Sequence, residues 1–93
     1  MNDFTSIAMS ANEVIKLIDE LRSLLDDYRS YGQMAVDAID ALDRLRSLVA
    51  DGKFSEANKM AGDLSSQVDF YRAFVPDLAS KMDGIHKILR SLS

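Results

Sequence analysis

The chain has 93 residues, of which 47% are apolar and 28% charged, and its net charge is −4. This length and composition suit one globular domain with a modest core, and they exclude a disordered or fibrous chain. The absence of cysteine excludes disulfides, thiolate nucleophiles and thiolate metal ligands, and no stretch approaches the roughly 18 apolar residues of a membrane span. With no export or anchoring signal after Met1, we expect a cytoplasmic protein.

The acidic residues lie mainly in the first half of the chain. Residues 1–51 carry 10 acidic and 5 basic side chains, whereas residues 52–93 carry 5 acidic and 6 basic ones. Neither half forms the basic stripe that phosphate contacts require. We therefore expect no nucleic acid and no membrane surface among the partners.

The first predicted element is a helical arm over about residues 4–50. Its apolar residues recur at steps of three and four, the heptad pattern of a helix that packs against another helix. Gly32 either ends a first helix or costs about 1 kcal/mol inside a continuous one. The heptad positions, which we call the seam, are Phe4, Ile7, Ala11, Val14, Ile18, Leu21, Leu25, Tyr28, Gly32, Ala35, Ile39, Leu42, Arg46 and Val49 in this arm.

Residues 51–54 are expected to form the turn between two arms. Asp51 and Gly52 make a helix stop, because glycine readily adopts the left-handed conformation that follows a helix end. Ser55 is a candidate N-cap for a helix that begins at Glu56. The fold class is therefore all-α, an antiparallel helical hairpin.

The second predicted arm covers about residues 55–92. Its only proline, Pro76, lacks a backbone N–H and favours the first turn of a helix, which predicts a break near Phe74 and Val75. The seam positions of this half are Phe54, Ala57, Ala61, Leu64, Val68, Tyr71, Val75, Leu78, Met82, Ile85, Leu89 and Leu92.

Two long arms satisfy this pattern, and so do four short helices that break near Gly32 and Pro76 to give a four-helix bundle. The heptad spacing of the seam continues unchanged across Gly32 and Pro76, which favours long, bent arms. Folding the arms about the turn sets small residues against large ones, with Leu42 opposite Ala61. The same register sets Gly32 opposite Tyr71, where a missing side chain would make room for the ring.

A second apolar stripe, which we call the apolar flank, runs beside the seam and comprises Leu17, Leu24, Tyr31, Leu45, Met60, Phe74 and Ile88. The opposite flank is polar and holds Arg22, Arg29, Asp43, Asn58, Ser65, Arg72 and His86. Two helices cannot enclose so wide an apolar stripe, so the stripe predicts an interface. Its partner would be a second copy, in a homodimer, or another helical protein. A fold-back of the chain at Gly32 and Pro76 would also cover it.

Signals for chemistry are weak. His86 has Asp83 three residues before it, but helical neighbours rarely supply the converging geometry of a catalytic triad. A single histidine without converging carboxylates is also a poor metal site. No glycine-rich phosphate loop is present. The sequence therefore predicts no enzyme, no catalytic residue, no metal, no cofactor and no small-molecule substrate.

The leading functional hypothesis is a non-enzymatic protein–protein interaction module, such as a small adaptor, inhibitor or regulator, that acts through the apolar flank. In length and expected shape the chain resembles the small helical-hairpin secretion proteins, although its turn lacks their Trp-x-Gly motif. That resemblance implies a secretion protein or a secretion chaperone. A third hypothesis is an acidic face around Asp37 and Asp40 that binds a basic partner, as a nucleic-acid mimic does.

Overall fold

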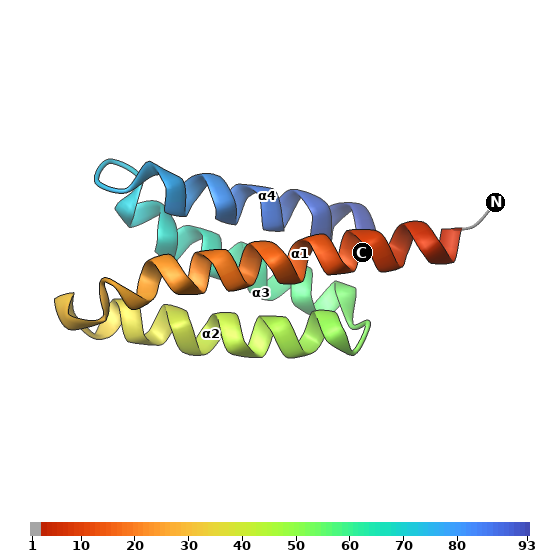
Figure 1. The fold of residues 1–93 in the computed structure, drawn as a ribbon, viewed down its shortest axis with the longest axis horizontal. Coiled ribbons are helices and arrows are strands. Elements are labelled where there is room, and N and C mark those ends of the chain that lie inside the picture. Colours follow the sequence, from red (N-terminus) through yellow and green to blue (C-terminus); the bar gives the residue numbers. More distant parts are fainter. Residues whose placement is uncertain (1–2) are drawn as a thin grey trace.

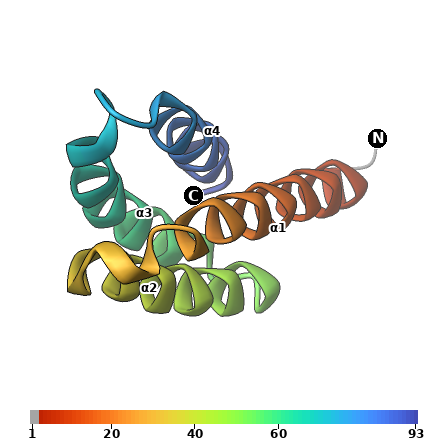
Figure 2. The same cartoon turned by 60° about the vertical axis from the view of Figure 1, so that its left-hand side comes forward.

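The computed structural model describes residues 3–93, with the side chains of residues 6–93 except that of Tyr31. This part of the chain contains no strand and forms the helices α1 (Asp3–Asp26), η1 (Arg29–Tyr31), α2 (Gln33–Ala50), α3 (Phe54–Val68), η2 (Asp69–Tyr71) and α4 (Pro76–Leu92). Each α-helix packs against its neighbours in the sequence, and α1 also packs against α4. The result is an up-down-up-down bundle that measures 46 × 21 × 19 Å (Figures 1 and 2). The all-α prediction is confirmed.

The turn between the two halves lies where the sequence predicts it. α2 ends at Ala50, and Gly52 follows with φ +76°. The amides of Gly52 and Lys53 donate to the carbonyls of Val49 (3.1 Å) and Leu48 (2.9 Å). These two bonds form a Schellman motif, which satisfies the last carbonyls of α2 and requires glycine at the left-handed position.

The predicted N-cap at Ser55 is wrong. α3 begins at Phe54, and the residue before it, Lys53, makes no side-chain capping bond. The carbonyl of Lys53 already accepts the first helical hydrogen bond, from the amide of Ala57 at 2.9 Å. Because the tight turn leads directly into α3, Ser55 lies inside the first helical turn and cannot cap it.

The preference for long, bent arms is also wrong, since the first arm breaks at residues 27–32. The amides of Asp27 and Tyr28 bond three residues back, and Gly32 then has φ +143° before α2 begins. A methyl group built at Gly32 would meet nothing within 4 Å. The explanation that Gly32 makes room for Tyr71 is therefore wrong as well. Gly32 is required by its backbone conformation, which side chains strongly disfavour.

The second arm breaks at residues 69–75, as Pro76 predicts. Pro76 is the first residue of α4, and Val75 before it is extended, with φ −136° and ψ 78°. The amide of Val75 closes the connection on the carbonyl of Tyr71 at 2.8 Å. Both connections are close to one heptad in length, so the seam keeps its phase although the helices end.

The core is formed by one face of each helix, and nearly all of its members are predicted seam residues. Seam positions that lie outside the core include Arg46, whose side chain is 48% exposed, and Ile7, which is 40% exposed. Ala38 and Leu45 of α2 and Ala79 of α4 are buried although they lie off the seam, because each helix packs against two others and its core face is wider than one seam. Phe4, the first predicted seam residue, lies outside the described side chains. Within residues 3–93, no helix is both long and apolar enough to cross a membrane. The buried residues are Val14, Ile18, Leu21, Leu25, Ala35, Ala38, Ile39, Leu42, Leu45, Val49, Ala57, Ala61, Leu64, Val68, Leu78, Ala79, Met82, Ile85 and Leu89.

Candidate interaction surface

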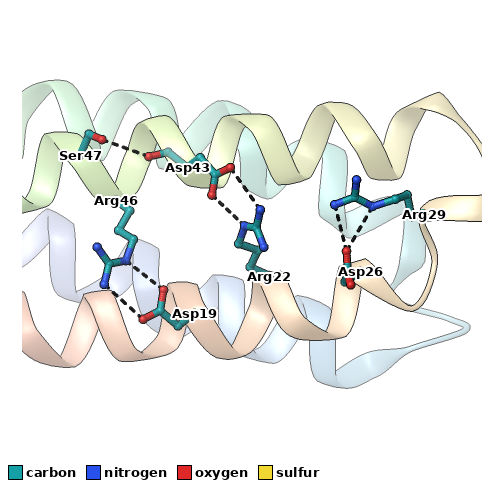
Figure 3. Close-up of polar contacts among 7 residues, drawn as sticks. All are labelled: Asp19, Arg22, Asp26, Arg29, Asp43, Arg46 and Ser47. Atoms are coloured by element: carbon teal, nitrogen blue, oxygen red, sulfur yellow. Dashed lines mark hydrogen bonds and ion pairs between the residues drawn. The ribbon is translucent and has the colours of Figure 1, made fainter.

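The α1–α2 face is closed by two ion pairs between the helices (Figure 3). Arg22 donates to Asp43 at 2.7 Å, and Arg46 donates to Asp19 at 2.9 Å. The hydrogen bond to each carboxylate, followed by the charge of that carboxylate, raises the pKa of both arginines above its ordinary value. All four side chains are close to half exposed, so these pairs align the helices more than they stabilise them.

The predicted apolar flank is largely turned inward. Leu45 is fully buried in the core, and Phe74 is 77% exposed. Four further members, Leu17, Leu24, Met60 and Ile88, are half-buried and pack against the core. Tyr31 lies in η1, and its side chain is outside the described part. The flank as an interface stays a prediction, with Phe74 as its most accessible described member.

The α1–α2 and α3–α4 connections lie at the same end of the bundle (Figure 1). Both contribute aromatic side chains to a single hollow of about 360 Å³. We call it the aromatic hollow; it is lined by Tyr28, Phe70, Tyr71, Phe74 and Val75. The rings of Phe70 and Tyr71 meet edge to face, with centroids 5.7 Å apart. Phe70 is 66% exposed and Phe74 77% exposed. Large apolar side chains so exposed, side by side around one hollow, mark a surface that a partner covers.

An ion-pair cluster holds the second connection in place. Arg72 donates to Asp69 within the connection and to Asp83 of α4 at 3.2 Å. Hydrogen bonds to these two carboxylates raise the pKa of Arg72 above its ordinary value. In the first connection, Arg29 pairs with Asp26 at 2.9 Å. The arginines of both connections, Arg29 and Arg72, are therefore already paired.

Phe70 is the residue of this surface that the sequence pattern did not predict. The signal was present, because residues 70–74 contain Phe70, Tyr71 and Phe74 directly before the helix-starting Pro76. Three aromatic residues in the connection of residues 69–75 cannot all face the core, since a connection has no continuous buried face. The heptad spacing places Tyr71 in the seam and gives Phe70 no role.

A second hollow, of about 470 Å³, lies on the outside of α2 and α3 and is lined by Asp43, Arg44, Ser47, Leu48, Asp51 and Met60. Asp43 is engaged by Arg22, and the Ser47 hydroxyl donates to the backbone carbonyl of Asp43 at 3.3 Å (Figure 3). Two of its polar side chains, Asp43 and Ser47, thus make contacts within the bundle itself.

The residues around His86 do not form a catalytic arrangement. Asp83, the carboxylate proposed to orient it, pairs with Arg72 instead. The His86 ring lies beside Gly62 of α3, where an added methyl group would be 3.7 Å from it. The nearby α3 residue Asn58 has a buried side-chain oxygen without a hydrogen-bond partner. Among the described residues, no group of three or more His, Asp or Glu side chains could hold a metal ion.

The acidic face around Asp37 and Asp40 is exposed on α2. Asp37 accepts a hydrogen bond from Gln33 at 3.0 Å. The neighbouring carboxylates Asp19 and Asp43 are neutralised by arginines, so they add little to a negative field there. The acidic-face hypothesis stays a prediction, and the geometry adds no feature that would position a basic partner.

Comparison with known proteins finds no protein-family model, no curated protein and no solved structure that matches the chain.

Proposed function

We propose that the protein is a non-enzymatic protein–protein interaction module that binds an apolar helical segment at the aromatic hollow. The observation that carries this proposal is the exposure of Phe70 and Phe74, at 66% and 77%, on the rim of a hollow lined by aromatic rings. Phenylalanine rings placed in this way serve as the anchors of interfaces, where a few aromatic residues provide most of the binding free energy.

The size of the exposed surface supports a binding role. A phenylalanine side chain offers about 200 Å², so the two exposed fractions leave about 290 Å² of aromatic surface in water. Covering this area gives about 7 kcal/mol at about 25 cal/mol per Å², before the costs of association. A partner that brings apolar surface of its own would gain several kcal/mol more.

The chemistry of the partner follows from the surroundings of the aromatic hollow. Arg29 and Arg72 are already paired with carboxylates, so an acidic ligand would have to break those pairs. The rim residues Phe70 and Phe74 are largely exposed, which suits the side chains of a helix that lies across an open groove. This arrangement favours an adaptor, inhibitor or regulator role over catalysis.

The proposal is tested with a synthetic leucine-rich amphipathic helix, titrated into the isotope-labelled full chain and followed by NMR. We expect shifts concentrated in residues 69–75 and at Tyr28, and Phe74→Asp should weaken binding at least about tenfold. Ala73→Asp is the matched control, because Ala73 is exposed on the same connection and does not line the aromatic hollow. Equal binding by Phe74→Asp and the wild type, or shifts confined to another face, would refute the proposal.

A further inference from the structure

Large exposed apolar side chains occur at both ends of the bundle. Phe70 and Phe74 surround the aromatic hollow at the end where the two longer connections lie. Ile7 and Met9 are 40% and 67% exposed, and they lie in the first turns of α1, toward the opposite end. The molecule therefore presents two uncovered apolar regions that are separated along its 46 Å axis (Figure 1).

The first turns of α1 project beyond the other helices in both views (Figures 1 and 2). The ion pair between Glu20 and Lys81 sets the antiparallel register of α1 and α4. Continuing that register toward the end of α4 puts Leu92, its last residue, level with Met9. The described side chains that precede Met9 in the sequence, residues 6–8, therefore lie beyond the end of α4. We call residues 6–9, up to the level of Leu92, the projecting segment.

The projecting segment and the lining of the aromatic hollow both expose apolar side chains, and neither carries a charged one. Residues 4–12 contain no charged side chain, in a chain where 28% of residues are charged. The arginines of the two connections are already paired, so the aromatic hollow has no unpaired cation among the described residues of those connections. Met9 adds a flexible thioether, which makes favourable contacts with aromatic rings, and four rings line the aromatic hollow.

We infer that the partner at the aromatic hollow is a second copy of this chain, whose projecting segment docks there head to tail. The inference rests on the proposed function, because it uses the same hollow and names its occupant. A single contact of this kind covers both apolar regions. The pair then keeps one free hollow, on one copy, and one free projecting segment, on the other copy, so the assembly grows as an open chain.

The exposed area makes this association weak and dependent on concentration. Phe70 and Phe74 together expose about 290 Å² at about 200 Å² for each ring, and the exposed parts of the smaller side chains Ile7 and Met9 add less than this. The total is well below the roughly 1,200 Å² of a standard stable interface. Neither contact region offers an ion pair for salt to screen, whereas each copy carries a net charge of −4, so we expect association to strengthen modestly from low to high salt as the repulsion is screened.

The test is the mass of the full chain by light scattering over about 0.01–1 mM, a range that covers transient interfaces. The wild type should rise above the chain mass of 10.3 kDa with concentration. Met9→Glu and Phe74→Glu should each stay monomeric. Ser23→Glu and Ala73→Glu are the matched controls on α1 and on the second connection, both at exposed positions, and they should associate as the wild type does.

Mixing the two single variants separates head-to-tail docking from symmetric docking. Met9→Glu keeps an intact aromatic hollow and Phe74→Glu keeps an intact projecting segment, so an equimolar mixture should form a dimer that cannot grow. If the contact joins two hollows, Met9→Glu associates alone; if it joins two projecting segments, Phe74→Glu associates alone. Either result overturns the inference.

A wild type that stays monomeric throughout the range also overturns the inference. Binding of the leucine-rich helix then shows which claim has failed. A monomeric chain that still binds that helix at the aromatic hollow contradicts only the second copy as partner. A monomeric chain that does not bind it contradicts the proposed function as well. All four substituted positions are exposed, so we expect every variant to keep the bundle intact. Far-UV circular dichroism of each variant checks this expectation.

Discussion

Replacing Gly32 with alanine distinguishes the four-helix bundle from two long arms by the sign of its effect on stability. Gly32 has φ +143° and ψ 176°, a region of backbone space that is essentially restricted to glycine. A side chain there costs about 1–3 kcal/mol of strain, offset by about 0.4–1 kcal/mol because alanine lowers the entropy of the unfolded chain. A methyl group at this position has open space, so no steric clash adds to the cost. We therefore expect a net loss of about 1–2 kcal/mol in the free energy of unfolding.

Gly84→Ala is the matched control, because Gly84 lies inside α4 and a methyl group there would meet Leu17 Cδ1 at 3.5 Å, an ordinary contact. This substitution should stabilise the protein by about 0.5–1 kcal/mol, since alanine is the better helix former. Urea unfolding followed by circular dichroism measures both, and the Gly32→Ala midpoint should fall by about 1 M.

The opposite sign at Gly32 would refute the broken first arm. If Gly32 lay inside a continuous helix, alanine would stabilise the chain by about 1 kcal/mol, as Gly84→Ala does. A stabilised Gly32→Ala variant would therefore mean that α1 and α2 form one helix in solution.

Two further substitutions test the second break and the inward orientation of the apolar flank. Pro76→Ala should change the free energy of unfolding by less than about 1 kcal/mol in the same urea assay, because proline at the first helical position is neither required nor harmful. If Pro76 lay inside a helix instead, its removal would stabilise the chain by about 3 kcal/mol. Leu45→Asp should cost more than about 4 kcal/mol and abolish the helical circular dichroism signal, because Leu45 is fully buried and the substitution would place a charged carboxylate in the apolar core. A helical Leu45→Asp monomer would instead place Leu45 at an interface between copies.

The heptad seam by itself determined most of the core. Residues spaced by three and four along a helix share one face, and that local geometry does not depend on how many helices the chain forms. Val14, Leu42, Leu64 and Ile85, one from each helix, are all buried as their spacing requires. The stop at Gly52 and the start at Pro76 were equally local, since both follow from the backbone preferences of a single residue.

Tertiary structure alone decided that the first arm breaks and which apolar residues stay exposed. Connections of about one heptad keep the seam in phase, so periodicity cannot reveal that the arms break. Contact of α2 with both α1 and α3 moved Arg46 out of the core and Leu45 into it. The aromatic hollow exists only because folding brings Tyr28 beside residues 70–75, which are far apart in the chain. Local spacing specifies which face of a helix is apolar, but only the packing of all the helices determines what covers that face.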